Sequence, residues 1–214
     1  QASCLARILG VPLHEVSHQQ GHIAASLWSA GRLDLMKTPH LAWHLSGGTT
    51  ELLLVTPDGK NVKAEKLGGT SDISAGQLID RTGKLLGLQF PAGKAIDALS
   101  RTSECKHKYR VKLRGLEFSF SGIQNQAEKF FADTQNPADT ARFVMNCIVG
   151  CIADATRAAL AEHPGLAVVF SGGVASNSML RERMREFSPV FAEPQFSTDN
   201  AMGVAVLTAL QEGL

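Results

Sequence analysis

The chain has 214 residues, of which 44% are hydrophobic and 19% are charged, and its formal net charge is +1. This composition excludes disordered and fibrous proteins, and it excludes a nucleic-acid binder that relies on overall basic charge, although a local basic strip can still contact phosphates. The length suffices for a sizeable core, in one large domain or two small ones.

The first predicted elements lead to a pair of histidines. Ala2–Leu9 has helical patterning, and Leu13–Ser17 predicts a short strand that leads into a helix with its C-cap at Gly31. His18 and His22 lie four residues apart in this helix, so both imidazoles share one face and can reach a single metal ion. Two solvated histidines at a polar helix start are the alternative, because short motifs often occur by chance.

A meander of three strands is predicted next, over Leu41–Leu45, Glu51–Val55 and Asn61–Leu67. Its first connection, Ser46–Thr50, is rich in glycine and hydroxyl groups, so backbone N–H groups can approach an anion there. An ordinary hairpin turn explains this connection equally well.

Two helices that each carry an aspartate follow the meander. Ala75–Leu86 is predicted as an amphipathic helix with Asp80 opposite its apolar residues, and Pro91–Gly93 opens a second helix that contains Asp97. Taken alone, both side chains are typical solvated carboxylates.

A basic strip comes after the second of these helices. Its cationic side chains alternate with other residues in a segment that looks extended, so the charges lie on one side of it. Such a strip usually keeps a sheet edge from pairing, and the functional alternative is contact with a phosphate backbone. The strip consists of Lys106, Lys108, Arg110, Lys112 and Arg114.

Two further helices are predicted in the middle of the chain. Ser121 can cap the first, Ile123–Phe131, and the second, Asn136–Ala161, has asparagine at its cap and proline at its first position. Cys147 and Cys151 share a face of the second helix. We expect them to be small core residues, since none of the four cysteines shows a Cys-x-x-Cys spacing and free cysteine is commonly buried.

The last predicted elements suggest a nucleotide site. Leu166–Phe170 is wholly apolar, as expected of a strand buried on both faces, and it runs into the double-glycine loop Ser171–Asn177 and a helix over Met179–Phe187. Strand, glycine loop and helix in this order recur where backbone amides hold nucleotide groups. Asp199 precedes the apolar helix Ala201–Leu210, as an N-cap or as a metal ligand.

Seven stretches of the chain, taken in order, resemble one family. They are His18–His22, Ser46–Thr50, Gly76–Asp80, Lys84–Leu88, Phe118–Gly122, Gly172–Asn177 and Thr198–Asn200. The family is that of the tRNA threonylcarbamoyladenosine synthesis transferases, formerly called O-sialoglycoprotein endopeptidases or glycoproteases. The resemblance implies an α/β, actin-like ATPase fold of the Hsp70 and sugar-kinase type, whose two lobes enclose a nucleotide and a metal.

The resemblance also implies an activity and a set of site residues. Family members transfer the threonylcarbamoyl group of threonylcarbamoyl-AMP to the N6 amine of an adenosine beside the tRNA anticodon, with the substrate amine as the attacking group, so no catalytic side chain is assigned. Carried over by position, the metal ligands are His18, His22 and Asp199. The phosphate-contacting residues are His44, Leu45, Ser46, Gly47 and Gly48, and the nucleoside contacts are Asp80, Gly93, Asp97 and Asn177.

Cofactors, partners and location follow from the same resemblance. We expect one divalent metal ion, iron or zinc, and threonylcarbamoyl-AMP, ATP or AMP as the bound nucleotide. The expected partners are tRNA, an inactive paralogue and the small ATPase subunit of the modification complex, with a homodimer as a further possibility. The sequence contains no apolar run of the roughly 18 residues that a membrane helix needs and no signal-peptide core, so we expect a cytoplasmic protein without a membrane partner.

The chain departs from the family pattern at several polar positions. Gln20 stands where an acidic residue is usual between the histidines, and Thr49 replaces a common histidine. Asp72–Ile73 and Gln77 stand for acidic residues, and Arg81 stands for the usual lysine. These exchanges fit a divergent paralogue as well as an active enzyme.

The beginning of the chain gives a further expectation. Residues 1–40 read as a remnant of the first lobe with the metal-binding helix, and residues 41–214 as the second lobe with the nucleotide loops and a helical insertion. Most of a first lobe should precede Gln1, so we expect a truncated member whose transfer activity is impaired in this chain alone.

Three other functions remain as alternatives. The first is a non-catalytic scaffold that dimerises with a full-length family member. The second is a metal-dependent glycoprotease, which is disfavoured because Gln19 occupies the place of the general base in His-Glu-x-x-His enzymes. The third, a sugar kinase or chaperone ATPase, would need a first-lobe phosphate loop and carboxylate.

Overall fold

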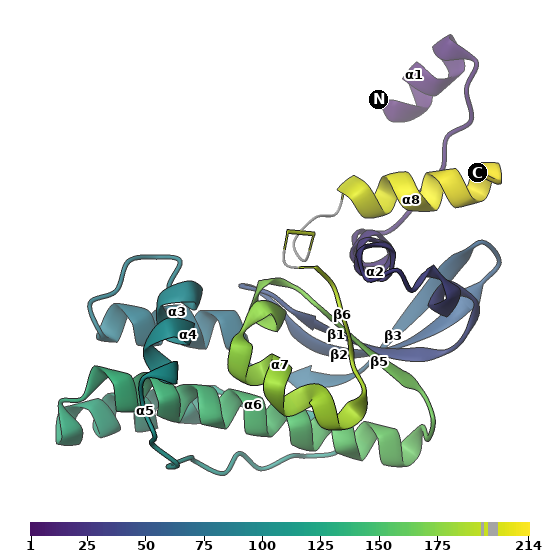
Figure 1. The fold of residues 1–214 in the computed structure, drawn as a ribbon. Helices are drawn as coiled ribbons and strands as arrows, with labels where there is room; N and C mark the ends of the chain where they lie inside the picture. Colours follow the sequence, from purple (N-terminus) through teal and green to yellow (C-terminus); the bar gives the residue numbers. More distant parts are fainter. Residues whose placement is uncertain (194, 197–200) are drawn as a thin grey trace.

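The computed structural model describes residues 1–193, 195–196 and 201–214. Its centre is a six-stranded sheet in the order β4–β3–β2–β1–β5–β6 (Figure 1). The pairs β1–β2 and β2–β3 are antiparallel, whereas β1–β5, β5–β6 and β3–β4 are parallel. The strands are β1 (His40–Leu45), β2 (Thr50–Asp58), β3 (Asn61–Thr70), β4 (Glu117–Phe118), β5 (Ala167–Ser171) and β6 (Val190–Phe191).

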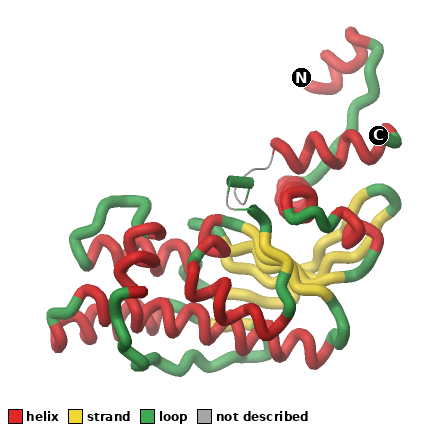
Figure 2. The backbone as a smooth tube through the Cα atoms, in the orientation of Figure 1, coloured by secondary structure: helices red, strands yellow, loops and turns green. Residues whose placement is uncertain are grey.

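Helices cover both faces of this sheet, as Figures 1 and 2 show. One face carries α2 (His18–Ser29), the 3-10 turn η1 (Leu33–Lys37) and α8 (Ala201–Glu212), and α1 (Ala2–Leu9) projects away from the body. The other face carries the remaining α-helices. They are α3 (Ala75–Leu85), α4 (Gly93–Arg101), α5 (Ser121–Thr134), α6 (Pro137–Glu162) and α7 (Ser178–Met184), with 3-10 turns η2 (Gly173–Ser176) and η3 (Arg185–Phe187) beside α7.

The alternation of side chains along the strands divides the apolar residues into two cores. Trp43 of β1 and Phe170 of β5 are fully buried against α3–α7. Ala42 and Val169, their neighbours in the chain, point to the opposite face and pack with Leu27 of α2. The same alternation turns the residue after Trp43 toward α2, where the site lies.

The long helix α6 is the main support of the larger core. Asn136 caps it by accepting the N–H of Asp139 at 3.1 Å, and Pro137 occupies its first turn, as predicted. The helix is long and apolar enough to cross a bilayer, but 67% of its apolar window is buried inside the protein, so packing in the core accounts for its hydropathy. Cys147 and Cys151 are buried free thiols, which confirms that they are core residues.

The cap of α5 differs from the prediction. Ser121 is the first residue of this helix and not its cap, and the capping oxygens come instead from Asp72, far back in the chain. The Asp72 carboxylate accepts the N–H groups of Phe120 and Ser121 at 2.8 and 3.2 Å and also the hydroxyl of Ser119. Burial raises the pKa of this carboxyl, but these hydrogen bonds outweigh it and hold the pKa well below its ordinary value.

One predicted strand is absent and two short ones were not predicted. Leu13–Ser17 joins α1 to α2 without regular structure, since no strand within the described residues lies alongside to complete a ladder. β4 and β6 have two residues each, too few for a periodic pattern. The basic segment has no regular structure until a single bridge joins Arg114 to Glu117.

Candidate functional site

The histidine pair lies in the first turn and a half of α2. Ser17 caps the helix reciprocally with Gln20: the hydroxyl of Ser17 accepts the Gln20 N–H at 3.2 Å, and the Gln20 amide oxygen accepts the Ser17 N–H at 2.7 Å. Gln20 Nε2 also donates to the carbonyl of Val62 at 2.7 Å, which ties this turn to β3. His18 and His22 share one face, with their Nε2 atoms 3.1 Å apart.

Helix α8 packs across α2 at Gly21 and Ala25. A Cβ on Gly203 would lie 1.7 Å from the carbonyl oxygen of Gly21, so the two backbones are in direct contact. The proposed third metal ligand, Asp199, lies outside the described residues, and the description resumes at Ala201. Within the described ranges there is no group of three or more His, Cys, Asp or Glu side chains placed to hold a metal.

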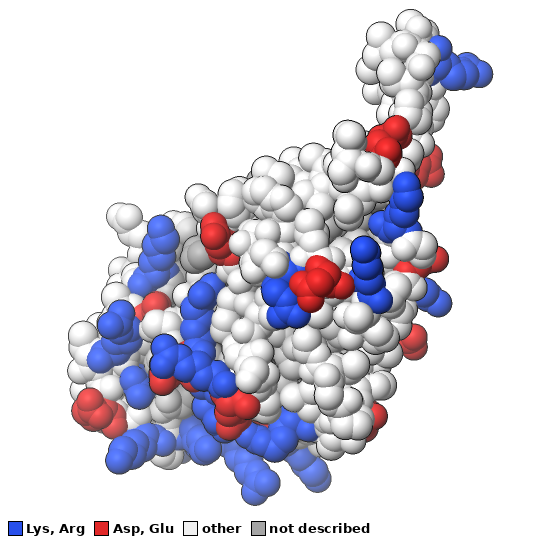
Figure 3. All heavy atoms as spheres, turned by 45° about the vertical axis from the view of Figure 1, so that its right-hand side comes forward, with Lys and Arg blue, Asp and Glu red and all other residues white. Residues whose placement is uncertain are grey.

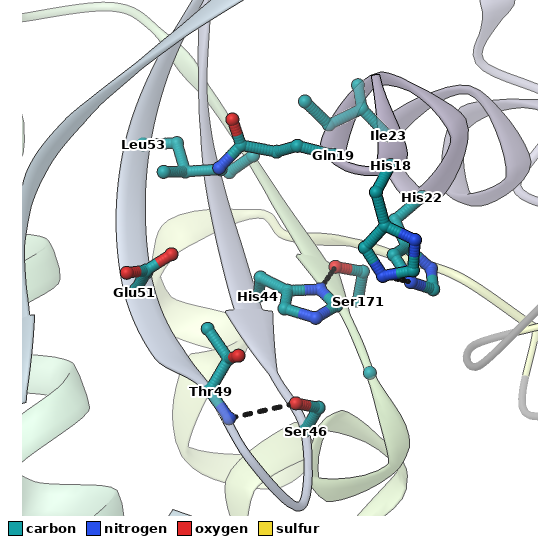
Figure 4. Close-up of a pocket in the computed structure, with 12 residues that line it drawn as sticks. His18, Gln19, His22, Ile23, His44, Ser46, Thr49, Glu51, Leu53 and Ser171 are labelled. Atoms are coloured by element: carbon teal, nitrogen blue, oxygen red, sulfur yellow. Dashed lines mark hydrogen bonds between the residues drawn. The ribbon is translucent and has the colours of Figure 1, made fainter. Parts of the chain in front are cut away.

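A row of polar side chains on the sheet faces the histidine pair. His44 of β1 is directly opposite Glu51 of β2 and directly opposite Ser171 of β5 in the strand register. The His44 ring lies 4.9 Å, centroid to centroid, from that of His22 (Figure 4). These side chains line a cavity of about 320 Å³ together with His18, Gln19, Ile23, Ala42, Ser46, Thr49, Leu53 and Gly172.

The protonation of His44 follows from its contacts. The Ser171 hydroxyl donates to the Trp43 carbonyl at 3.0 Å, so its oxygen accepts from His44 Nδ1, at 3.2 Å. This pattern assigns the proton of the neutral ring to Nδ1 and leaves Nε2 as an acceptor. Burial, followed by the repulsion from a charged His22, lowers the pKa of His44 to about 4. His44 is therefore neutral at physiological pH.

The glycine loop between β1 and β2 forms one wall of the cavity. Ser46 Oγ accepts the N–H groups of Gly48 and Thr49 at 3.3 and 3.0 Å, so the loop is closed on itself as a turn. The loop also abuts the start of α3: the Ser74 hydroxyl donates to the Gly47 carbonyl at 2.7 Å. A Cβ on Gly76 would lie 2.6 Å from Gly47 Cα, so this close approach requires glycine.

A second cluster joins α4 to the start of α7. Asp97 Oδ1 accepts from Asn177 Nδ2 at 2.9 Å and from the N–H and hydroxyl of Ser178 at 3.1 and 2.7 Å. Two residues that were predicted as nucleoside contacts, Asp97 and Asn177, are thus in direct contact. Asp80 Oδ1 accepts the N–H of Ala92 at 2.8 Å and so fixes the entry to α4, where Gly93 is exposed.

The structure brings the predicted site residues together as two groups and not as one. His18, His22, His44 and Ser46 line the cavity, whereas the described lining contains none of Asp80, Gly93, Asp97 and Asn177. The Leu45 side chain is buried in the core, so only its backbone faces the loops. Gly172 connects the groups, because it lines the cavity and begins the turn that ends at Asn177.

Gly172 and Glu51 show what sequence reasoning found and what it missed. Gly172 has φ +87°, and a Cβ there would lie 2.2 Å from the Leu45 carbonyl oxygen, so the predicted glycine loop has a steric cause. The sequence pattern assigns Glu51 only to the start of a strand, yet Glu51 lines the cavity and pairs with Lys66 at 3.1 Å. Its position opposite His44 follows from the hairpin register, which no local sequence pattern shows.

Comparisons with known proteins agree with the resemblance. Residues 1–206 match the model of the tRNA N6-adenosine threonylcarbamoyltransferase family. A curated protein of that name from Carboxydothermus hydrogenoformans is 34% identical over 95% of this chain and 63% of its own length. Its counterpart from Thermosipho africanus is 33% identical over 96% of the chain and 64% of its own length. The chain thus spans less than two thirds of these relatives.

Solved structures show the same fold at low identity. The match to the phosphate- and nucleotide-bound form of HypF covers 98% of this chain and 37% of the HypF chain, with a TM-score of 0.71 and 15% identity. The activator of 2-hydroxyisocaproyl-CoA dehydratase from Clostridium difficile matches 92% of this chain and 67% of its own, with a TM-score of 0.57 and 15% identity. These matches confirm the expected α/β, actin-like ATPase fold.

Proposed function

The chain belongs to the tRNA N6-adenosine threonylcarbamoyltransferase family, and from this membership we propose that it transfers a threonylcarbamoyl group from threonylcarbamoyl-AMP to the N6 amine of an adenosine in tRNA. The observation that carries the proposal is the position of His18 and His22 opposite His44 and Ser46 across one cavity. This arrangement supports the proposal, because two imidazoles and a glycine loop face the same cavity.

The donor set fits the metal that the family resemblance implies. Two nitrogens that bind one metal at about 2.0–2.1 Å in neighbouring positions lie roughly 3 Å apart, and the two Nε2 atoms are 3.1 Å apart. We propose His18, His22 and Asp199 as the ligands of one iron or zinc ion, a set that leaves open positions. Support for Asp199 is that α8, which begins two residues later, packs against Gly21. A bound metal would supply charge stabilisation for phosphate or acyl oxygens.

The second cluster suits the nucleoside. All three hydrogen bonds to Asp97 end on Oδ1, so Oδ2 can accept a ribose hydroxyl. Asn177 and Asp80 complete the proposed nucleoside contacts, and the turn from Gly172 to Asn177 spans the distance from the cavity to this cluster. The rate enhancement would come from positioning and electrostatics, with the substrate amine as nucleophile.

Partners and location are further parts of the proposal. We propose tRNA as the macromolecular substrate, a paralogue and a small ATPase as protein partners, and the cytoplasm as the location. Residues 1–40 and 41–214 remain proposed as parts of the two lobes. A glycoprotease is not proposed, because the amide of Gln19, which lines the cavity, cannot act as a general base.

A non-catalytic scaffold is the second candidate, and Gln20 is the observation that favours it. Where family members usually have an acidic group, this chain has a neutral amide that is engaged with Ser17 and Val62. Light scattering of the chain alone, and mixed with a full-length paralogue, tests this candidate. A stable complex combined with absent transfer would support the scaffold.

The transfer reaction is tested with threonylcarbamoyl-AMP and an unmodified tRNA transcript, and AMP binding is measured by calorimetry alongside. We expect His18→Ala/His22→Ala to lower transfer by about 100-fold or more, as expected when an electrostatic stabiliser is lost. His163→Ala, at the end of α6, is the matched control and should leave transfer unchanged. Equal transfer by the double variant and the control would refute the proposed site.

A further inference from the structure

The basic strip lies on a strongly charged segment that the proposed site does not use. Residues 101–114 carry six lysines and arginines and one carboxylate, Glu104, which gives a formal charge of +5 in a chain of net charge +1. The segment runs beneath α6 in Figure 1, and Lys and Arg side chains gather along the lower part of the molecule in Figure 3. No ion pair found in the described part of the chain involves these six cations.

The backbone of this segment is fixed against α6 although it has no regular structure. Asn146 Nδ2 donates to the carbonyls of Cys105 and His107 at 3.0 and 3.1 Å. The N–H of Tyr109 donates to Cys147 Sγ at 3.1 Å. These bonds from two neighbouring residues of α6 hold the segment in one place, so the charges are presented on a defined surface.

Several odd-numbered side chains of the segment contact the protein, whereas Tyr109 is exposed like the cations. His107 stacks on Phe130 and Phe143, with ring centroids 5.6 and 5.4 Å away, and Val111 and Leu113 pack against the core. The five cations of the strip, at even-numbered positions from 106 to 114, are all exposed. In an extended chain they stand about 6–7 Å apart along one line.

Protection of a sheet edge does not explain this strip. The segment from Lys106 to Leu113 belongs to no strand and lies across helices, and the sheet is reached only at the Arg114–Glu117 bridge. A line of unpaired cations that is fixed to a helix, with the half-exposed ring of Tyr109 among them, matches instead the pattern of backbone-tracking charge and base stacking found in RNA-binding surfaces.

A cavity lined by arginines extends the strip toward the proposed nucleoside contacts. It measures about 540 Å³, and its polar lining residues are Arg101, Arg142, Arg183, Asn146, Ser178 and one carboxylate, Glu182. Arg142 Nε is buried and has no hydrogen-bond partner among the described residues. Asn146 also binds the strip, and Ser178 also binds Asp97.

We propose that the strip and the arginine-lined cavity form one binding surface for the phosphate backbone of RNA, with Tyr109 as a platform for a base. The RNA would enter along Lys106–Arg114 and pass Arg101 and Arg142 on its way to the Asp97 cluster. Only the identity of this RNA as tRNA rests on the proposed function.

The surface is tested by fluorescence anisotropy of a labelled, unmodified tRNA transcript over a series of salt concentrations. We expect Lys108→Gln/Lys112→Gln to reduce the slope of log affinity against log salt by about 1.5, and the affinity by about 10- to 30-fold near 0.1 M salt, because two phosphate contacts are lost. Lys37→Gln/Lys63→Gln removes the same charge from exposed positions elsewhere and should change neither value. Thermal unfolding verifies that both variants fold.

Two further measurements separate the possible outcomes. Tyr109→Ala should weaken binding about fivefold or more at an unchanged salt slope, because stacking releases no counterions. His18→Ala/His22→Ala should bind tRNA as the unmodified chain does, so a failed transfer assay would leave this surface standing. An equal loss of tRNA affinity in the two double-lysine variants would overturn the proposal. If polyglutamate displaced the labelled tRNA as well as unlabelled tRNA does, the proposal would also fail, in favour of an acidic protein partner.

Discussion

At the scale of single residues, the site depends on the state of one buried imidazole. His44 is held by Ser171, whose hydroxyl proton is already used by the Trp43 carbonyl, so the ring keeps its own proton on Nδ1. The neighbouring His22 ring, 4.9 Å away, makes a second positive charge unfavourable. A neutral third imidazole can face the histidine pair without repelling a bound cation.

Acidification should therefore destabilise the metal-free protein through His44. The pKa of His44 is 6.5 when unfolded and about 4 when folded, so between these values the unfolded chain binds more protons and stability falls as pH falls. Urea unfolding in the presence of EDTA should show that the free energy of unfolding falls by on the order of 3 kcal/mol between pH 7 and pH 4 because of this group. His44→Gln should remove this part of the pH dependence. An identical pH profile in the variant would contradict the assignment.

At the scale of elements, long-range polar contacts fix helix starts that the local sequence leaves open. Asp72 caps α5 from a different part of the chain, and its hydrogen bonds lower the pKa of its carboxyl although burial acts in the opposite direction. The charge of Asp72 also lies at the positive end of the helix dipole.

Asp72→Asn should lower the free energy of unfolding by about 1 kcal/mol at neutral pH, a usual value for a lost helix cap. Because the folded pKa is depressed, the stabilisation is present above the unfolded value of 3.8 and is lost as pH falls below it. Denaturant titrations of both proteins at several pH values should therefore converge in acid. A constant difference would indicate that packing, and not charge, makes the contribution.

The contact of α8 with α2 gives a second prediction for an element. Gly203→Ala would place a Cβ 1.7 Å from the Gly21 carbonyl oxygen, so α8 has to move away from the histidine helix. We expect the free energy of unfolding to fall by about 2 kcal/mol, a value typical of overpacking. We also expect this variant to bind metal more weakly. Gly150→Ala, with open space around the new Cβ, is the control and should stabilise α6 by up to about 1 kcal/mol. Unfolding curves and metal titrations of both variants provide the comparison.

The sequence predicts the elements whose patterns are local and fails where the cause lies elsewhere in the chain. The helix with His18 and His22, the strand before Gly172 and the long α6 all appear in the structure, because hydrophobic period and capping residues specify them. The strand predicted over Leu13–Ser17 is wrong, since a strand exists only with a partner. Glu51 entered the candidate site through its register opposite His44, which no local pattern reveals.

At the scale of the whole molecule, the sheet separates two surfaces with different proposed tasks. The face covered by α2 and α8 holds the histidine cavity, and the layer formed by α5 and α6 carries the basic strip on its outer side. The turn from Gly172 to Asn177 connects the histidine cavity to the Asp97 cluster, because Asn177 donates to Asp97. Substrate RNA would thus reach the Asp97 cluster from the side of α6, and the proposed metal would lie on the side of α2.

Metal analysis tests the central claim most directly. The chain is loaded with iron or zinc, dialysed and analysed by mass spectrometry, next to His18→Ala/His22→Ala and the control His163→Ala. We predict about one tightly held metal ion per chain in the unmodified protein and the control, and almost none in the double variant. Equal metal content in all three proteins, or none in the unmodified chain, would contradict the site proposed for His18 and His22.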